Sequence, residues 1–396
     1  MKALVLNSGS SSLKYQLFQL PEETVLCSGL VDKIGQAGCV LKHKQNGQKV
    51  DFDLPDADHT EALNKVSKVL VSEEHGVIKS AQEVDVVGHR VVHGGEEFNT
   101  TTIINEKVKA KIKALFSLAP LHNPANLQGI DVAEEVFPSA KQIAVFDTAF
   151  HSNIPEHAYR YAIPNELYEK HGIRTYGFHG TSHRFVANKS KALFGIDPDK
   201  NKIVTIHLGN GCSMAAIKDN KCIDTTMGLG PLAGLVMGTR SGDIDPSVIF
   251  YLSEKGHDIS DIRLILNKNS GLKGLTGESD MRAVKELADK GSSAAKLALD
   301  IYAYRIKKYI GAYTAALNGL DSIIFTGGVG ENDADMRANV CAEMDALGIE
   351  INNEENAKWS DEARDVSNGK VKVLIIPTNE ELEIATQCYR LITTGE

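Results

Sequence analysis

The order of elements at the start of the chain recurs near residue 202. The segment KIVTIHLGNGCSMAAIKDNKCIDTT reads as strand, glycine-containing tip, strand, turn and strand, as residues 2–31 do. Later, DSIIF runs into TGGVGEN much as KQIAVF runs into DTAFHS. Although β-turn-β units are common, two such coincidences in the same order favour an internal duplication. Two related halves facing each other would surround one cleft with four strand-end turns, near Asn7, Asp147, Gly209 and Gly327.

The length of the chain also favours two domains, because 396 residues with 42% apolar content exceed one ordinary core. Strand patterns, with a hairpin turn at Asn46-Gly47, fill most of the first third, and helical spacing follows in HTEALNKVSKVLVSEEH, INEKVKAKIKALFSL and NLQGIDVAEEVF. The apolar strands VDVVGHRVV and KQIAVFDT fit a buried parallel sheet. We therefore predict the α/β class, with one domain of residues 1–148 plus 383–396 and a second of residues 149–382.

Charge and cysteine usage exclude several classes of protein. The net charge of -9 argues against a nucleic-acid partner, and no basic run suggests a membrane surface. The six cysteines are scattered, without a CxxC pair or a zinc spacing, and are expected to be reduced thiols in the cytoplasm. The apolar start ALVL is too short for a signal sequence, and no run of about 18 apolar residues predicts a membrane span.

Three glycine-bearing turns follow predicted strands: NSGSSS at 7–12, HLGNG at 207–211 and FTGGVGEN at 325–332. The first is a hairpin tip whose N–H and O–H donors suit an anion, although that stretch alone is read more simply as a solvated turn. None is a Walker A sequence, and GGVG lacks the full dinucleotide spacing. Each alone is more often a plain turn, but together they indicate a nucleotide held between two lobes.

Two arginines and two histidines stand beside small residues. Arg90 lies in VVGHRVVHGG and Arg240 in MGTRSGDIDP. Either could be paired with a core carboxylate, but the planar guanidinium also matches two oxygens of a carboxylate or a phosphate. His179 in YGFHGTSH and His207 in HLGNG are placed to donate to a phosphoryl oxygen, although a lone histidine is usually structural.

Two carboxylates follow predicted strands. Asp147 ends IAVFD, and Glu380 lies in IIPTNEELEIA before the last helix. Glu380 could simply cap that helix, because carboxylates favour first turns. The alternative is a Mg²⁺ site, in which one or two carboxylates and several waters bridge the phosphates of a nucleotide.

These residues together resemble the acetate kinase family, within the superfamily that also holds sugar kinases, heat-shock ATPases and actin. The match is end to end, in NSGSSSLK, HRVVHGG, LHNP, FDTAFH, YGFHGTSH, HLGNG, MGTRSGDIDP, GESDMR, FTGGVGEN and IPTNEE. The resemblance implies two related actin-like (ribonuclease H-like) domains facing an interdomain cleft. It also implies Mg²⁺- or Mn²⁺-dependent, reversible in-line transfer of a phosphoryl group from ATP to acetate, giving ADP and acetyl phosphate.

The resemblance assigns roles to individual residues. It places Asn7 and Glu380 near the metal, and Ser10, Ser12 and Lys14 near the phosphates. It gives Arg90 and Arg240 the carboxylate and the transferred phosphoryl group, gives His179 the transition state, and makes His122 and His207 supporting residues. The remaining nucleotide-binding positions are Leu208, Gly209, Asn210, Gly211, Asp280, Met281, Arg282, Gly327, Gly328, Val329, Gly330 and Glu331.

The resemblance also implies a role for Asp147, because the matching residue in the family is regarded as a proton donor or acceptor. Acetate is already ionised at neutral pH and needs no base, so a role in orienting Arg90 or a metal-bound water fits better. The apolar pocket for the methyl group would be formed by Val92, Leu121, Phe178 and Pro231.

Three alternatives remain at this point. A propionate or butyrate kinase is the nearest, since one methylene is worth only about 1–3 kcal/mol. An ATPase switch protein on the same fold would have no need of two arginines and a methyl pocket. Pyrophosphate as the donor is disfavoured by GESDMR and FTGGVGEN. Family likeness also predicts a homodimer through the second lobe and hinge closure around the nucleotide.

Overall fold

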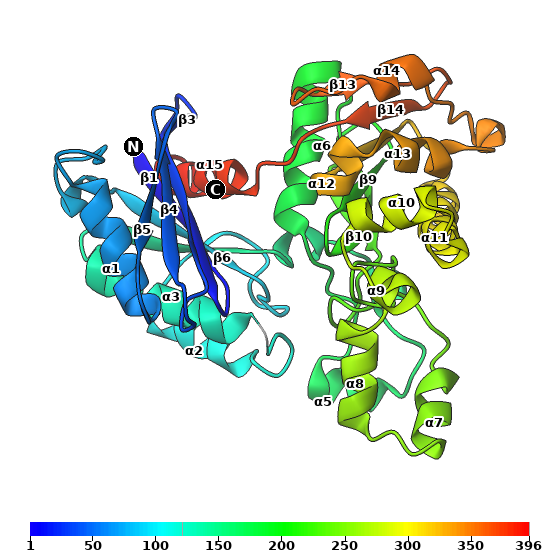
Figure 1. The fold of residues 1–396 in the computed structure, drawn as a ribbon, viewed down its shortest axis with the longest axis horizontal. Helices are drawn as coiled ribbons and strands as arrows, with labels where there is room; N and C mark the ends of the chain where they lie inside the picture. Colours follow the sequence, from blue (N-terminus) through cyan, green and yellow to red (C-terminus); the bar gives the residue numbers. More distant parts are fainter. Residues whose placement is uncertain (121, 396) are drawn as a thin grey trace. The chain divides into compact units, whose positions relative to one another are not determined.

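The computed structural model describes residues 1–120 and 122–395, in two compact units (Figure 1). The first unit comprises Met1–Phe150 and Asn379–Glu396, and the second comprises His151–Thr378. The chain passes from one to the other through the short 3-10 helix η2 (Ala149–His151). Each unit is built on its own β-sheet.

The first unit has a sheet in the order β5-β4-β3-β2-β1-β6-β8-β7. Its strands are β1 (Lys2–Ser8), β2 (Ser12–Gln19), β3 (Thr24–Asp32), β4 (Val40–Gln45), β5 (Gln48–Asp53), β6 (Val86–Val91), β7 (Thr102–Ile103) and β8 (Lys141–Phe146). Its helices are α1 (His59–Leu70), η1 (Ala81–Glu83), α2 (Glu106–Ala114), α3 (Asn123–Val136) and α15 (Glu380–Thr393). The hairpin with a serine tip, the Asn46-Gly47 turn and the parallel pair β6 and β8 are as the sequence predicts.

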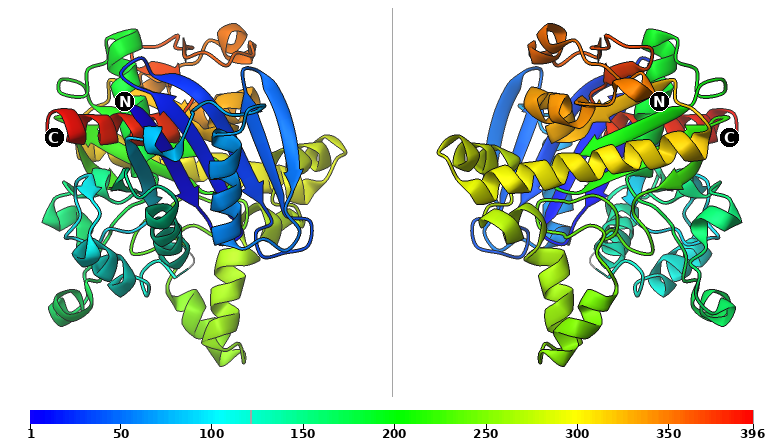
Figure 2. Two further views of the ribbon diagram at one scale, coloured as in Figure 1. Left: turned by 90° about the vertical axis from the view of Figure 1, so that its left-hand side faces the viewer. Right: turned by 90° about the vertical axis from the view of Figure 1, so that its right-hand side faces the viewer.

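The second unit has a sheet in the order β11-β10-β9-β12-β14-β13. Its strands are β9 (Ile203–Leu208), β10 (Cys212–Lys218), β11 (Lys221–Thr225), β12 (Ser322–Thr326), β13 (Arg364–Asp365) and β14 (Lys372–Ile375). Its helices are α4 (Glu156–Tyr159), α5 (Asn165–His171), α6 (Gly180–Phe194), α7 (Ser247–Glu254), α8 (Ile259–Lys268), α9 (Gly271–Thr276), α10 (Met281–Asp289), α11 (Ser293–Leu317), α12 (Gly327–Asn332), α13 (Ala334–Cys341), η3 (Asp345–Leu347) and α14 (Asn353–Ala357). The long helix α11 crosses one face of this sheet (Figure 2).

The two sheets share one topology. In each, three consecutive antiparallel strands are followed by two parallel ones: β3-β2-β1-β6-β8 in the first unit and β11-β10-β9-β12-β14 in the second. The first three strands of each series are the segments whose order recurs in the sequence. The predicted α/β class and the duplicated pair of domains are confirmed, while the predicted cleft stays a prediction.

Strand β1 is buried on both faces, which explains its unbroken apolar run. Leu4 and Leu6 belong to a core formed with α1 and α3, whereas Ala3 and Val5 belong to another formed with α15. Burial of both faces is the pattern of a central strand covered by helices on each side. The carboxyl ends of the parallel strands β6 and β8 therefore meet at one edge of the sheet, held in place by a rigid core.

Local sequence chemistry sets the helix boundaries near these edges. The side chain of Asn379 accepts the N–H of Leu382 and so begins α15 directly before Glu380. Asp58 and Glu61 form a reciprocal capping box at the start of α1. The three helices expected in the first unit are all present, although α1 and α2 end several residues before their apolar patterns do.

Candidate active site

An ion-pair cluster lies at the carboxyl ends of β6 and β8 in the first unit. Nη2 of Arg90 donates to Oδ2 of Asp147 at 2.7 Å, and its Nε donates to the same oxygen at 3.0 Å. Nε also lies 3.8 Å from a carboxylate oxygen of Glu380, the first residue of α15. The structure thus brings together three residues that the sequence singles out separately.

The electrostatics of this cluster are dominated by carboxylates. Burial alone would lower the pKa of Arg90, but Asp147 and Glu380 outweigh it and hold that pKa above its ordinary value. Burial raises the pKa of Glu380, and the neighbouring Asp147 and Glu381 raise it further, against the opposing effect of Arg90. Glu380 is therefore a desolvated carboxylate beside two further carboxylates, which is an environment that suits an added cation.

The serine tip lies on the same unit. Asn7 pairs with Lys14 across the β1–β2 hairpin, and Nζ of Lys14 lies 2.5 Å from Glu381, next to Glu380. Ser10 is exposed at the tip, and the carbonyl of Ser12 accepts the N–H of Gly9. The hairpin therefore connects the predicted metal and phosphate residues to the cluster through Lys14.

Helix α3 holds the strand ends next to this cluster. Nδ2 of Asn126 donates to the carbonyl of Ser8 at 2.8 Å, and its Oδ1 accepts the N–H of Val92 at 3.1 Å. Asn126 thus ties the end of β1 to the predicted methyl-binding Val92, although the sequence reading does not include it. His122 precedes α3, and the predicted Leu121 lies outside the described residues.

A second cluster, in the second unit, contains His179, His207 and Arg240. The rings of His179 and His207 stack with their centroids 4.5 Å apart. A Cβ at Gly211 would lie 3.5 Å from Nε2 of His179 and 3.6 Å from Nη1 of Arg240, so both groups border the same point beside Gly211. His179 has φ 57°, a left-handed conformation that is rare outside glycine and that gathers at functional sites.

Arg240 is partly buried and has no carboxylate partner within the described part of the chain. Its Nη1 donates to the carbonyl of Pro231 at 2.9 Å and lies 3.6 Å from the sulfur of Met237. Burial lowers its pKa, against a smaller opposing effect of the Cys212 thiol. A desolvated guanidinium of this kind is a candidate anion-binding group, because a buried charge is costly unless it is paired.

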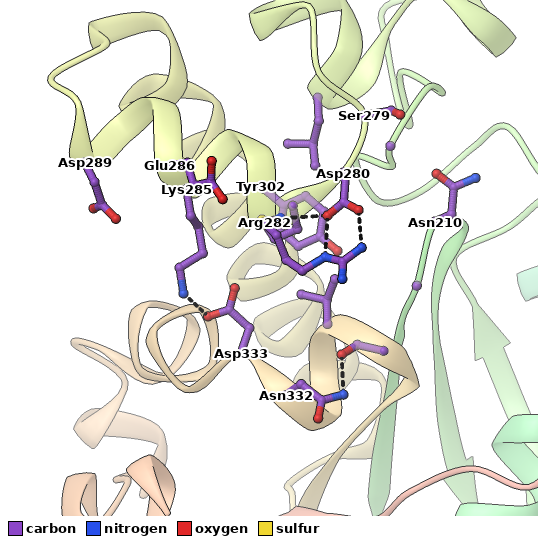
Figure 3. A pocket seen from close by; sticks show the side chains of 16 residues that line it. Asn210, Ser279, Asp280, Arg282, Lys285, Glu286, Asp289, Tyr302, Asn332 and Asp333 are labelled. Atoms are coloured by element: carbon purple, nitrogen blue, oxygen red, sulfur yellow. Dashed lines mark hydrogen bonds and ion pairs between the residues drawn. The ribbon is translucent and has the colours of Figure 1, made fainter. Parts of the chain in front are cut away.

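A cavity of about 920 Å³ lies in the second unit, within the size range of small-molecule sites (Figure 3). Seven of the predicted nucleotide-binding residues line it: Gly209, Asn210, Asp280, Met281, Arg282, Gly328 and Val329. Nη2 of Arg282 contacts Oδ2 of Asp280 at 2.6 Å, and this ion pair lowers the pKa of Asp280 to about 2. Lys285 reaches Asp333 at 2.7 Å on the same wall.

Other predicted nucleotide residues do not line this cavity: His207, Leu208, Gly211, Gly327, Gly330 and Glu331. The expected turn FTGGVGEN is in fact the strand β12 followed directly by helix α12, so its reading as a turn is wrong. The carboxylate of Glu331 accepts the N–H of Gly327 at 2.8 Å, which caps the helix that the glycines begin. Gly327 has φ +77°, and a Cβ there would lie 2.8 Å from the carbonyl of Leu208.

Several lining residues escaped the sequence reading. The rest of the cavity wall is formed by Gly238, Leu272, Ser279, Lys285, Glu286, Asp289, Tyr302, Asn332 and Asp333. Ser279 stands inside the quoted GESDMR motif, so its neighbours were a usable signal. Tyr302 lies in the middle of a long helical pattern, and nothing local marks it as a lining residue.

The residues of the first cluster fit a divalent cation of the hard, oxygen-preferring kind. Among residues 1–120 and 122–395, no group of three His, Cys, Asp or Glu side chains could hold a metal ion by itself. Mg²⁺ characteristically uses one or two carboxylates and completes its shell with water and phosphate oxygens. Within the same described residues, no helix combines the length and apolar character needed to cross a membrane.

The sequence matches the profile of the Acetokinase family over residues 2–386. It is 54% identical to the acetate kinase of Flavobacterium johnsoniae over 395 residues, covering 99% of this chain and 100% of that one. The crystal structure of Porphyromonas gingivalis acetate kinase has a TM-score of 0.94 and 45% identity, with coverage of 99% and 100%.

The chain belongs to the acetokinase family. A propionate kinase from Francisella tularensis is also similar, with a TM-score of 0.91, 42% identity and 98% coverage of each chain. The predicted family is therefore confirmed, and the fold comparison holds at high identity over the whole length.

Proposed function

We propose that this protein is an acetate kinase that transfers the terminal phosphoryl group of ATP directly to a carboxylate oxygen of acetate. Family membership supports the kinase class, with a carboxyl group as acceptor, and with ATP and a divalent metal as the family's requirements. The observation that carries the assignment of residues is the partly buried Arg240 without a carboxylate partner.

The chemistry asks little covalent work of the protein. The acceptor is already ionised, so the difficulty is to bring an anion up to a phosphate that carries several negative charges. Arg240 supplies a desolvated, planar donor for the transferred phosphoryl oxygens, and His179 beside it donates to the same group in the transition state. Arg90, oriented by two hydrogen bonds that it donates to Asp147, binds the acetate carboxylate.

Asp147 is assigned an orienting role and not that of a proton carrier. It is 1% exposed and is engaged by both Nε and Nη2 of Arg90. A carboxylate committed in this way fixes the guanidinium plane. Mg²⁺ is the proposed metal, with Glu380 and Asn7 beside it, where it would neutralise charge on the β- and γ-phosphates.

The nucleotide is assigned to the cavity of the second unit. Its glycine-bearing wall, at Gly209, Gly328 and Val329, leaves backbone close to the ligand, and Asp280 and Arg282 supply polar groups at the rim. Ser10, Ser12 and Lys14 of the first unit are assigned to the phosphates.

A coupled assay of acetyl phosphate formation tests the function. Comparing kcat/KM for acetate, propionate and butyrate should give acetate the highest value, with propionate lower by about 10- to 100-fold. Equal use of propionate would assign a broader acyl kinase. ATP hydrolysis that ignores acetate and yields no acetyl phosphate would reject the proposal in favour of an ATPase switch.

A homodimer in the cytoplasm is the proposed state. Helix α7 buries none of its residues although its sequence is SVIFYLSE, and Phe250 is 67% exposed. On α8, Ile259 is 68% exposed. Large exposed apolar side chains on two helices that contact each other are characteristic of a protein contact. Light scattering should show a dimer that Phe250→Lys converts to a monomer, whereas Trp359→Lys, at another exposed apolar residue, leaves it intact.

A further inference from the structure

A hydrogen-bond network of buried side chains leads away from His179, on the side opposite Arg240. Nδ1 of His179 lies 2.9 Å from Oγ of Ser213, and the same oxygen lies 2.8 Å from Nε2 of His183. Nδ1 of His183 in turn lies 2.7 Å from Oγ1 of Thr205. His183, Ser213 and Thr205 are each 0% exposed, so water does not compete for these bonds.

The hydroxyl of Thr205 sets the donor-to-acceptor direction of the hydrogen bonds in this network. Its oxygen lies 2.7 Å from Nδ1 of His183, where either atom could donate, and 3.5 Å from the carbonyl of Ala215, the outer limit for a hydrogen bond that the hydroxyl would donate there. The hydroxyl proton therefore belongs on the His183 side. His183 then donates from Nε2 to Ser213, and Ser213 donates to Nδ1 of His179.

We propose that His183 is a positioning residue for His179, fixing through Ser213 the tautomer in which Nε2 of His179 carries the proton. This inference rests on the proposed function, because it concerns the proton that His179 offers to the phosphoryl group. Nε2 is the correct edge, since it faces the space beside Gly211 that Arg240 also borders.

The hydrogen bonds of this network keep a single direction only while His183 stays neutral. Burial lowers the pKa of His183 well below its ordinary value, and the neighbouring His151 and His207 lower it further. Their rings lie 5.8 and 6.3 Å from that of His183. A neutral imidazole with one donor and one acceptor transmits direction, whereas an imidazolium with two donors would not.

Nitrogen-15 NMR of the full-length protein, labelled at histidine, reads the tautomer directly. The His179 signals are assigned by their loss in His179→Gln. We expect Nε2–H in the wild type and a mixture of tautomers in Ser213→Ala and Thr205→Val. Each variant should lose about ten-fold in kcat with KM unchanged, as expected when one oriented hydrogen bond is removed. Thr205→Ser, which keeps the hydroxyl, should restore both readouts.

A matched control separates positioning from simple loss of a buried hydroxyl. Ser190 on α6 is also 0% exposed, and its hydroxyl donates only to backbone carbonyls, of Ala187 and Ile196. Ser190→Ala should leave the tautomer and kcat unchanged.

A wild-type signal showing Nδ1–H would overturn the inference even if no variant folded. An unchanged His179 tautomer in both Ser213→Ala and Thr205→Val would also overturn it, while leaving the proposed function intact. Conversely, full activity of His179→Ala would remove the proposed role of His179 itself, whatever its tautomer.

Discussion

Arg90 and Arg240 occupy similar surroundings in the sequence but very different ones in the structure. Arg90 is bound by Asp147 and approached by Glu380, so its charge is already compensated. Arg240 rests on the carbonyl of Pro231 and the sulfur of Met237, and no carboxylate joins it within the described residues. Carboxylates raise the pKa of the first arginine, and burial lowers the pKa of the second.

In the proposed reaction, this difference would give the two guanidinium groups different tasks. The compensated arginine is rigidly oriented, which suits a singly charged carboxylate that must be aimed. The uncompensated arginine retains its full charge for a group whose negative charge spreads in the transition state. Four predictions test this difference between the two arginines.

Replacement of Arg240 should have the largest effect on activity. Arg240→Met removes the uncompensated charge, so kcat should fall by about 10²- to 10³-fold. Because the change removes a half-buried charge and leaves no carboxylate unpaired, the free energy of unfolding should stay the same or rise, although the carbonyl of Pro231 loses one donor. Initial rates and urea unfolding measure the two quantities. A variant with full turnover would reject the assignment.

Replacement of Arg90 should cost stability as well as activity. Arg90→Met leaves the buried carboxylate of Asp147 and the partly buried one of Glu380 without their cation, a situation that costs about 3–5 kcal/mol. The double variant Arg90→Met/Asp147→Asn should regain part of that stability but none of the activity. If the single variant were as stable as the wild type, the compensated character of this site would be wrong.

Removal of His179 should have a smaller effect, confined to the chemical step. His179→Ala loses one transition-state donor, so kcat should fall by about 10- to 100-fold while both KM values hold. Steady-state kinetics with ATP and acetate varied in turn provide the measurement. A change in KM alone would mean that His179 binds the ground state and the transition state equally.

The smallest effects should appear as opposite pH dependences of stability. The raised pKa of Glu380 gives a contribution that is present below pH 4.5 and is lost as pH rises through the folded value. The pKa of Asp280, lowered from 3.8 to about 2 by Arg282, gives a contribution present above 3.8 and lost toward pH 2.

Urea unfolding between pH 2 and pH 8 tests both signs. Relative to the wild type, Glu380→Gln should gain stability as the pH rises, whereas Asp280→Asn should recover its deficit as the pH falls. The Asp280 effect is the lesser one, because exposed ion pairs contribute little. Parallel curves for both variants would contradict the assigned environments.

The elements that carry the clusters were predictable because their patterns are local. The apolar runs before Asp147 and around Arg90 predict a buried parallel pair, and β6 and β8 are that pair. The duplicated order near residue 202 predicts the second sheet. The glycines at 327–330 were misread as a turn, because the capping carboxylate of Glu331 returns from four residues ahead.

The contacts that distinguish the two arginines could not be predicted. Asp147 lies 57 residues from Arg90 along the chain, and Glu380 arrives from the far end. Neither spacing is periodic, so only the packed sheet determines the pairing. The hydrogen bonds that lead from His179 are similar: His183 stands in the quoted YGFHGTSH motif, but Thr205 and Ser213 belong to strands β9 and β10.

In the proposed reaction, the charge of Arg240 stabilises the phosphoryl group during its transfer. Calorimetric titration with ADP, Mg²⁺, acetate and aluminium fluoride, a planar mimic of that group, measures this directly. Arg240→Met should bind ADP as the wild type does but bind the mimic complex about 10²-fold or more weakly. Equal affinity of both proteins for the mimic complex would contradict the account.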